Sequence, residues 1–164
     1  MKIANVVKIP GMKKVEYDRL IEDEHVCRIA FKGDKYPYVA PFVYVFDGKF
    51  MYFLSTKYGK KIRHFEQDPH VSVEVERYAP DLSRYQFVTL RGKLVEVSNP
   101  DEKRAIRERF MNLIKGKNLS KNIMTALGHS PQDPIESIVE EERSLIWKLA
   151  EVEKIVGLKS EGEI

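Results

Sequence analysis

The sequence has few of the features that mark secreted, membrane-spanning or cysteine-ligated metal proteins. Its single cysteine, Cys27, can form neither an internal disulfide nor a cysteine-based zinc site, so we expect a reducing, cytoplasmic location. No apolar stretch reaches the ~20 residues that a membrane-spanning helix needs, so we expect no membrane partner. Residues 1–14 carry scattered lysines and no long apolar run, so we expect no signal peptide.

Strong charge and recognisable catalytic sets are also missing. The net charge of +3 is small and the signs are well mixed, which predicts no nucleic-acid partner. No Ser/His/Asp or Cys/His set stands out, so we expect no catalytic side chain. The histidines show no metal-ligand spacing, so we expect no metal site and place them at the surface or partly packed: His25, His64, His70 and His129.

The chain has the length and the apolar content for one domain over residues 1–164, built mainly from β-strands. A short helix over residues 13–24 is followed by β-type segments. We expect strands over 25–31, 36–46, 49–55, 70–76, 85–97 and 145–152, and one or two helical turns over 59–67. We also expect a helical insertion at about 99–143, whose shorter helices lie over 120–127 and 134–141. Asp47-Gly48 is a two-residue hairpin signal, and Asn99-Pro100 begins the insertion with a helix cap. This pattern predicts an antiparallel barrel with peripheral helices.

The strand over residues 36–46 is apolar on both of its faces. Tyr38, Phe42 and Tyr44 fall on one face, whereas Val39, Pro41, Val43 and Val45 fall on the other. Only one face of a barrel strand can point inside, so a partner subunit, a flat ligand or the 99–143 helices must cover the other. Because two-fold dimers are the commonest oligomers, we predict a homodimer, with the helices as the alternative cover.

Two other strands differ in how regularly they alternate. The 70–76 strand places Val71, Val73 and Val75 inward, as a half-exposed antiparallel strand does. In the 85–97 strand the inward set Val88, Leu90, Gly92 and Leu94 passes to Val95 and Val97, which predicts a bulge near the glycine. Trp147 alternates with Leu145 and Leu149, so we place it in the core or at a dimer interface.

One segment, residues 52–63, carries the groups that a phosphate monoester needs. A hydrophobic strand ends in Ser55-Thr56, Gly59 allows a turn, and a short helix begins with Lys60-Lys61. Hydroxyls, N–H groups at a helix start and ammonium groups all bind phosphate. The segment lacks a P-loop pattern, so a nucleoside triphosphate is not indicated. From the residues alone, a solvated helix face with a basic run is the simpler interpretation.

The order of these pieces resembles the pyridoxamine 5′-phosphate oxidase-like family of FMN-binding split barrels. The resemblance rests on Tyr38–Tyr44, Met51–Thr56, Gly59-Lys60-Lys61-Ile62, Asp68-Pro69 followed by a Val-x-Val strand, and Arg91–Val95. It covers about residues 13–97 and returns at the 145–152 strand. It implies a split β-barrel that binds FMN at the interface of a homodimer.

The resemblance also implies roles for individual residues. Lys61 would contact the FMN phosphate, supported by Lys60, Ser55 and Thr56. Val39, Ala40, Pro41 and Phe42 would run along the isoalloxazine ring and present backbone groups to its polar edge. The implied function is a flavin-dependent oxidoreductase that uses a small-molecule electron donor and acceptor, and in which the flavin itself does the redox chemistry.

Several alternatives stay open at this point. The chain could be a non-catalytic flavin carrier or sensor, or a split barrel that uses a deazaflavin or haem instead. A basic module that binds nucleic acid through residues 57–63 comes last. The C-terminal arginine and histidine arrangement of the vitamin B6 oxidases is not found in residues 144–164, which argues against that substrate.

Overall fold

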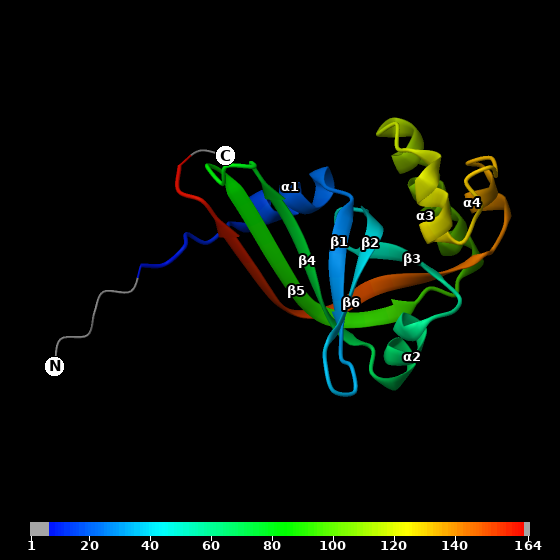
Figure 1. Ribbon diagram of the computed structural model, residues 1–164, viewed down its shortest axis with the longest axis horizontal. Helices are drawn as coiled ribbons and strands as arrows, with labels where there is room; N and C mark the ends of the chain where they lie inside the picture. Colours follow the sequence, from blue (N-terminus) through cyan, green and yellow to red (C-terminus); the bar gives the residue numbers. More distant parts are fainter. Residues whose placement is uncertain (1–6, 163–164) are drawn as a thin grey trace.

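The computed structural model describes residues 7–162, and it is built around a closed six-stranded barrel in the order β1-β2-β3-β6-β5-β4, with every neighbouring pair antiparallel (Figure 1). The predicted mainly-β fold with peripheral helices is therefore confirmed. The ends of the predicted 1–164 domain, residues 1–6 and 163–164, lie outside the described residues. The strands are β1 Val26–Phe31, β2 Tyr38–Phe46, β3 Met51–Thr56, β4 His70–Tyr78, β5 Tyr85–Glu96 and β6 Ser144–Lys159. The helices are α1 Lys14–Asp23, α2 Lys60–Gln67, α3 Pro100–Gly116, the 3-10 helix η1 Lys121–Leu127, and α4 Ser137–Glu140.

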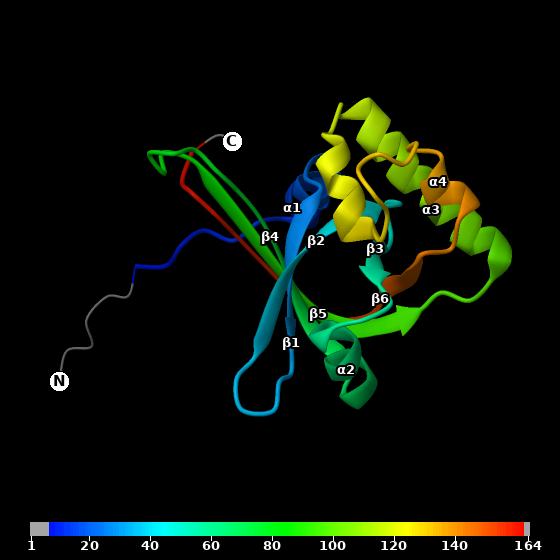
Figure 2. The same ribbon diagram turned by 45° about the vertical axis from the view of Figure 1, so that its right-hand side comes forward.

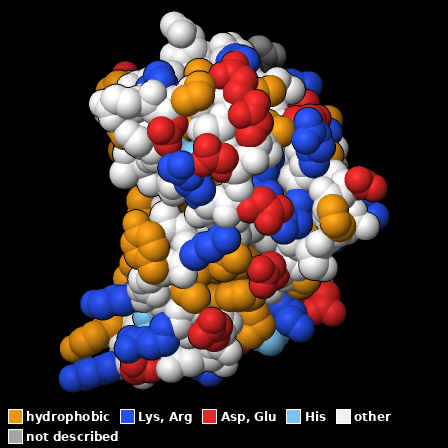
Figure 3. All heavy atoms as spheres, turned by 90° about the vertical axis from the view of Figure 1, so that its right-hand side faces the viewer, with side chains coloured by type: hydrophobic (Ala, Val, Ile, Leu, Met, Phe, Trp, Pro, Cys, Tyr) orange, Lys and Arg blue, Asp and Glu red, His pale blue; other side chains and the backbone are white. Residues whose placement is uncertain are grey.

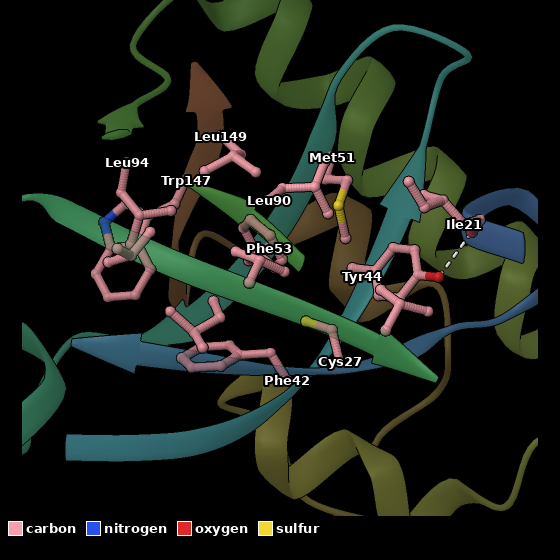
Figure 4. Packing of buried hydrophobic residues seen from close by; sticks show 14 of the residues in the cluster. Ile21, Cys27, Phe42, Tyr44, Met51, Phe53, Leu90, Leu94, Trp147 and Leu149 are labelled. Atoms are coloured by element: carbon pink, nitrogen blue, oxygen red, sulfur yellow. Dashed lines mark hydrogen bonds between the residues drawn. The ribbon is translucent and has the colours of Figure 1, made fainter. Parts of the chain in front are cut away.

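The barrel interior is filled by side chains that alternate along the strands. On β4, Val71, Val73 and Val75 are buried, as their alternation predicts. Phe53, Trp147 and Leu149 reach the same cluster from β3 and β6 (Figure 4). The Tyr44 hydroxyl donates a hydrogen bond of 2.7 Å to the Ile21 carbonyl, which fastens the end of α1 to the barrel (Figure 4). Trp147 is completely buried, so its predicted place in the core is confirmed.

The bulge lies on β6 and not on β5, where the sequence pattern predicts it. The β5–β6 ladder pairs Arg91 with Lys154 but Lys93 with Ala150, so the extra residues lie in β6, where Glu151 has a φ of 48°. Gly92 allows β6 to pass close to β5, because a Cβ at this position would lie 2.8 Å from the Ala150 carbonyl oxygen. β5 therefore keeps its alternation, and Val95, predicted to point inward, is 37% exposed. Val97 is buried, but against the helices rather than in the barrel.

The helices α3, η1 and α4 cover the outer face of β2, β3 and β6 (Figures 1 and 2). Val43, Val45 and Leu54 pack there against a second apolar cluster contributed by the helices: Ile106, Phe110, Ile114, Met124, Leu127 and Ile138. The Asn99 side chain accepts hydrogen bonds of 3.0 Å from the backbone N–H groups of Asp101 and Glu102, which confirms the predicted cap. The helices of residues 99–143, and not a second copy of the chain, therefore cover this part of the outer face of β2.

Two local features of this cover differ from expectation. The predicted last helix, over residues 134–141, is limited to Ser137–Glu140 because the residues before it form a turn. His129 is buried, and its Nδ1 lies 3.1 Å from the Ser137 hydroxyl oxygen. Burial, together with the nearby positive charge of Arg143, lowers the pKa of His129, which favours the neutral imidazole inside the helical cover.

Among residues 7–162, none of the helices is long and apolar enough to span a membrane.

Candidate functional site

The strands β2 and β3 separate at the end of the barrel where α2 lies. They pair only through Tyr44–Phe46 and Met51–Phe53. Beyond that point, Tyr38–Val43 continue to pair with β1, while Leu54–Thr56 pair with β6. Within the described part of the chain, the edges of β2 and β3 that face each other here therefore have no ladder partner. Pro41 suits such an edge because it has no N–H to leave unpaired.

This separation brings the two halves of the predicted site to one place. The ring-contact residues Val39–Phe42 lie on the β2 side, and Ser55-Thr56 lie on the β3 side, immediately before the turn into α2. We call this region the β2–β3 split and define it by residues 39–42 and 55–61. Residues far apart in the sequence thus share one edge of the barrel.

α2 begins at the split with its first backbone N–H groups uncapped. Gly59, the residue before the helix, has a φ of 105°, a conformation that favours glycine, and no side chain of the described residues caps the helix. Free N–H groups and the helix dipole make such a helix start attractive to an anion. Lys60 stands exposed on the first turn.

Lys61 is half-buried at the split. Its Nζ lies 5.5 Å from the centroid of the Phe42 ring, so one lysine spans from α2 to β2. Burial lowers the pKa of Lys61 from its usual range. No carboxylate lies within ion-pair distance of Nζ among residues 7–162. A partly buried cation without a counter-charge is well suited to an anionic ligand.

The hydroxyl groups of Ser55 and Thr56 already donate hydrogen bonds within the chain. Ser55 is fully buried and donates a 2.9 Å hydrogen bond to the Thr56 carbonyl oxygen. Thr56 Oγ1 donates a 3.3 Å hydrogen bond to the Tyr58 carbonyl oxygen. These bonds shape the turn into α2, and a direct contact with phosphate would require a hydroxyl to turn away. The contacts proposed for Ser55 and Thr56 stay predictions.

On β2 the predicted ring contacts alternate between the two faces. Val39 is 57% exposed and Pro41 is exposed, whereas Phe42 is buried in the barrel core. A ligand at this edge could therefore touch the side chains of Val39 and Pro41, but only the backbone of Phe42. Five cavities among residues 7–162 are lined by residues outside the split. The exposed Val39 and Pro41 leave this edge of β2 open to solvent.

An aromatic cluster lies beneath α2 and closes this end of the barrel. Phe65 packs on Trp147 with ring centroids 4.9 Å apart, and His64 lies 5.2 Å from the Tyr38 ring. His64 is 4% exposed, and its Nδ1 has no hydrogen-bond partner among residues 7–162. The predicted position at the surface or partly packed is therefore wrong for His64. The helical spacing of Lys61, His64 and Phe65 is the signal in the sequence that they share one face. Where Figure 3 shows this end of the molecule, hydrophobic side chains lie beside lysine and arginine.

Two further kinds of site, a reactive thiol and a metal centre, depend on the cysteine, histidine and acidic side chains. Cys27 is buried in the barrel, and burial raises the pKa of its thiol, which disfavours the reactive thiolate. Among the described residues, no group of three or more His, Cys, Asp or Glu side chains is placed to hold a metal ion.

Solved structures with the same fold cover nearly the whole chain. An FAD-binding protein from Mesorhizobium loti matches with a TM-score of 0.69 and 19% identity, over 94% of this chain and 99% of its own. An FAD-binding protein from Mycobacterium smegmatis matches with a TM-score of 0.60 and 12% identity, over 93% of this chain and 98% of its own. An FAD- and haem-binding protein from Mycobacterium smegmatis matches with a TM-score of 0.63 and 18% identity, over 92% of this chain and 72% of its own.

Sequence comparison gives a more specific result than these structural similarities, whose low identities establish the fold alone. No curated protein matches the chain. The family model described as pyridoxamine 5′-phosphate oxidase matches residues 13–137, which include the β2–β3 split and α3. The barrel with its diverging β2 and β3 is a split barrel, and the chain belongs to the pyridoxamine 5′-phosphate oxidase family.

Proposed function

We propose that this chain binds a flavin at the β2–β3 split and that the flavin is FMN. The observation that carries the proposal is the end of the β2–β3 ladder, which leaves the edge of Val39–Phe42 unpaired beside the start of α2. A flavin ring has a polar edge that can bond to a free strand edge. Three structural neighbours described as FAD-binding or FAD- and haem-binding support a flavin in this fold.

The donor set of the split fits a phosphate monoester. FMN ends in such a group, which carries close to two negative charges at neutral pH. Lys60, the unpaired Lys61 and the uncapped N–H groups of α2 together match that charge. FAD would instead place a diphosphate there and would need further surface for its adenosine. Titration with both flavins separates the two.

The reaction we propose is electron transfer between a small-molecule donor and a small-molecule acceptor. The flavin supplies the redox chemistry when bound. Lys61 holds the phosphate, the free edge of β2 orients the ring, and the aromatic cluster under α2 keeps water out of the barrel end. No side-chain acid or base is assigned, because the chemistry resides in the cofactor.

Colour and turnover distinguish this function from its rivals. The purified chain should be yellow, whereas a haem protein would be red-brown. Reduction of the bound flavin by a nicotinamide cofactor, with re-oxidation by an acceptor over many cycles, would establish an enzyme. A flavin that is bound but never turns over would favour a carrier or sensor.

We also propose that the active form is a homodimer whose second copy completes the open split. The helical cover reaches Val43 and Val45 but not Val39, Pro41 or Val26, and these three stay exposed. An apolar face of this kind, next to an open ligand edge, is suited to a second copy of the chain.

Charge placed on the uncovered face tests the dimer. Val26→Asp should produce a ~19 kDa species in sedimentation at low micromolar concentration and should weaken FMN binding, because an interface of about 1,600 Å² does not tolerate a buried charge and Val26 lies outside the split. The matched control is Val15→Asp, on the exposed side of α1, which should change neither property. A wild-type chain that sediments at ~19 kDa while it binds FMN would rule out the dimer.

A further inference from the structure

A cavity of about 460 Å³ lies outside the split, between the base of the β1–β2 loop and the bulge of β6. Its volume is within the range of roughly 300–1,000 Å³ that is typical of small-molecule sites. Ala30, Pro37 and Ser72 line one part, and the backbone around Gly92 lines another. The β1–β2 loop projects at the same end of the molecule as α2 (Figure 2).

The cavity is next to the strand that we expect to hold the flavin ring. Ala30 pairs with Val39 in the β1–β2 ladder, and Pro37 directly precedes β2. Neighbouring strands lie ~4.8 Å apart, so the cavity begins one strand away from the ring-contact residues. A molecule bound there would therefore be a neighbour of a flavin at the split.

The wall of the cavity opposite β1 is built by the break in the β5–β6 ladder. The register shift between Arg91 and Lys93 makes β6 bulge, and Glu151 and Glu153 of the bulge reach the cavity rim. A side chain at Gly92 would collide with the Ala150 carbonyl, so the close packing that produces the bulge needs glycine. The hollow is thus a product of the backbone of two strands.

The lining is rich in basic side chains, of which one is unpaired. Lys32 and His70 both lie near the Asp68 carboxylate, at 3.7 and 2.7 Å, and Lys93 lies 4.0 Å from Glu151. Arg91 has no carboxylate within ion-pair distance among residues 7–162. A free guanidinium can bind a carboxylate or phosphate through two parallel hydrogen bonds.

We propose that this cavity is a substrate site for a small organic anion, with Arg91 binding its carboxylate or phosphate group and the hollow beside Ala30 and Pro37 receiving its apolar part. Its role as a substrate site rests on the proposed flavin function, whereas the binding itself does not.

Titration of the FMN-loaded protein with phenyl phosphate tests the site, because FMN then occupies the split. Amide NMR shifts at Ser72 and Gly92 should report binding with a dissociation constant of ~0.1–1 mM. Arg91→Gln should weaken it by at least about tenfold, the effect of losing one charge-assisted pair. Arg84→Gln, an exposed arginine beyond the far end of β5, has the same charge change and should leave binding unchanged.

Additional ligands and variants identify the anionic group that binds, and they distinguish the anion site from the proposed flavin function. Tighter binding of phenyl phosphate than of benzoate identifies a phosphate site, and the reverse identifies a carboxylate site. Equal binding of benzyl alcohol, or loss of binding in Lys61→Ala but not in Arg91→Gln, would overturn the proposal. A chain that binds no flavin but binds phenyl phosphate through Arg91 would refute the proposed function and leave the anion site standing.

Discussion

Lys61→Ala should weaken FMN binding by roughly 10- to 100-fold, because a charge-assisted bond to phosphate is worth about 1.5–3 kcal/mol. Riboflavin, which has no phosphate, should bind almost as it does to the wild type. Lys61 is the residue best placed for this role, since its half-buried ammonium crosses from α2 to Phe42 without a carboxylate partner among residues 7–162. Fluorescence titration with the two flavins measures both affinities.

Two further variants show whether the charge is what matters. Lys61→Arg keeps the charge and should restore most of the FMN affinity. Lys154→Ala removes an exposed lysine of β6, away from the split, and should have no effect. If Lys61→Ala weakened FMN and riboflavin equally, Lys61 would be supporting the fold or the ring and not reading the phosphate.

Phe110→Ala should lower the free energy of unfolding by about 3–5 kcal/mol, because it leaves a cavity in the cluster between the helical cover and the barrel. Phe110 is completely buried there, between Ile106 and Ile114 on the same face of α3. Urea denaturation measures the loss. Met111→Ala, its half-buried neighbour on α3, is the matched control and should cost clearly less.

Because the helical cover buries part of β2, a charged substitution beneath it cannot be used to test for a dimer. Val43 is buried beneath the helices, so Val43→Asp would place a charge in an apolar interior and destabilise the fold whatever the oligomeric state. Only exposed positions outside the split, such as Val26, can report on a dimer. Equal losses of unfolding free energy for Phe110→Ala and Met111→Ala would mean that the helices pack only loosely on the barrel. A second copy of the chain would then again be a candidate to cover the whole outer face of β2.

Local signals in the sequence are enough to predict most elements. The alternation of Val71, Val73 and Val75 determines which face of β4 is buried, and helices begin after Asn99 and Gly59 as predicted. The composition of residues 55–61 is compatible with phosphate binding, but it is the resemblance to the family, and not the composition, that favours a phosphate over a solvated basic helix face. These signals are local because each depends on residues within one or two turns or on one strand face.

Features that depend on pairing between distant residues cannot be predicted in this way. The separation of β2 from β3 depends on which partner each strand finds, and nothing within either strand encodes it. The bulge depends on how β6 passes Gly92, so the glycine indicates a bulge but not which of the two strands carries the extra residues. The outer face of β2 is equally compatible with helices or a second copy, because both bury the same apolar side chains.

Titration of the flavin-free protein with FMN tests the central claim most directly. The flavin fluorescence should be quenched with a dissociation constant in the micromolar range or tighter, about −8 kcal/mol or better. Parallel titrations with FAD and riboflavin should give weaker binding, because the split is proposed to recognise a phosphate monoester. An absence of quenching at ~100 μM FMN, or tighter binding of FAD than of FMN, would contradict the account.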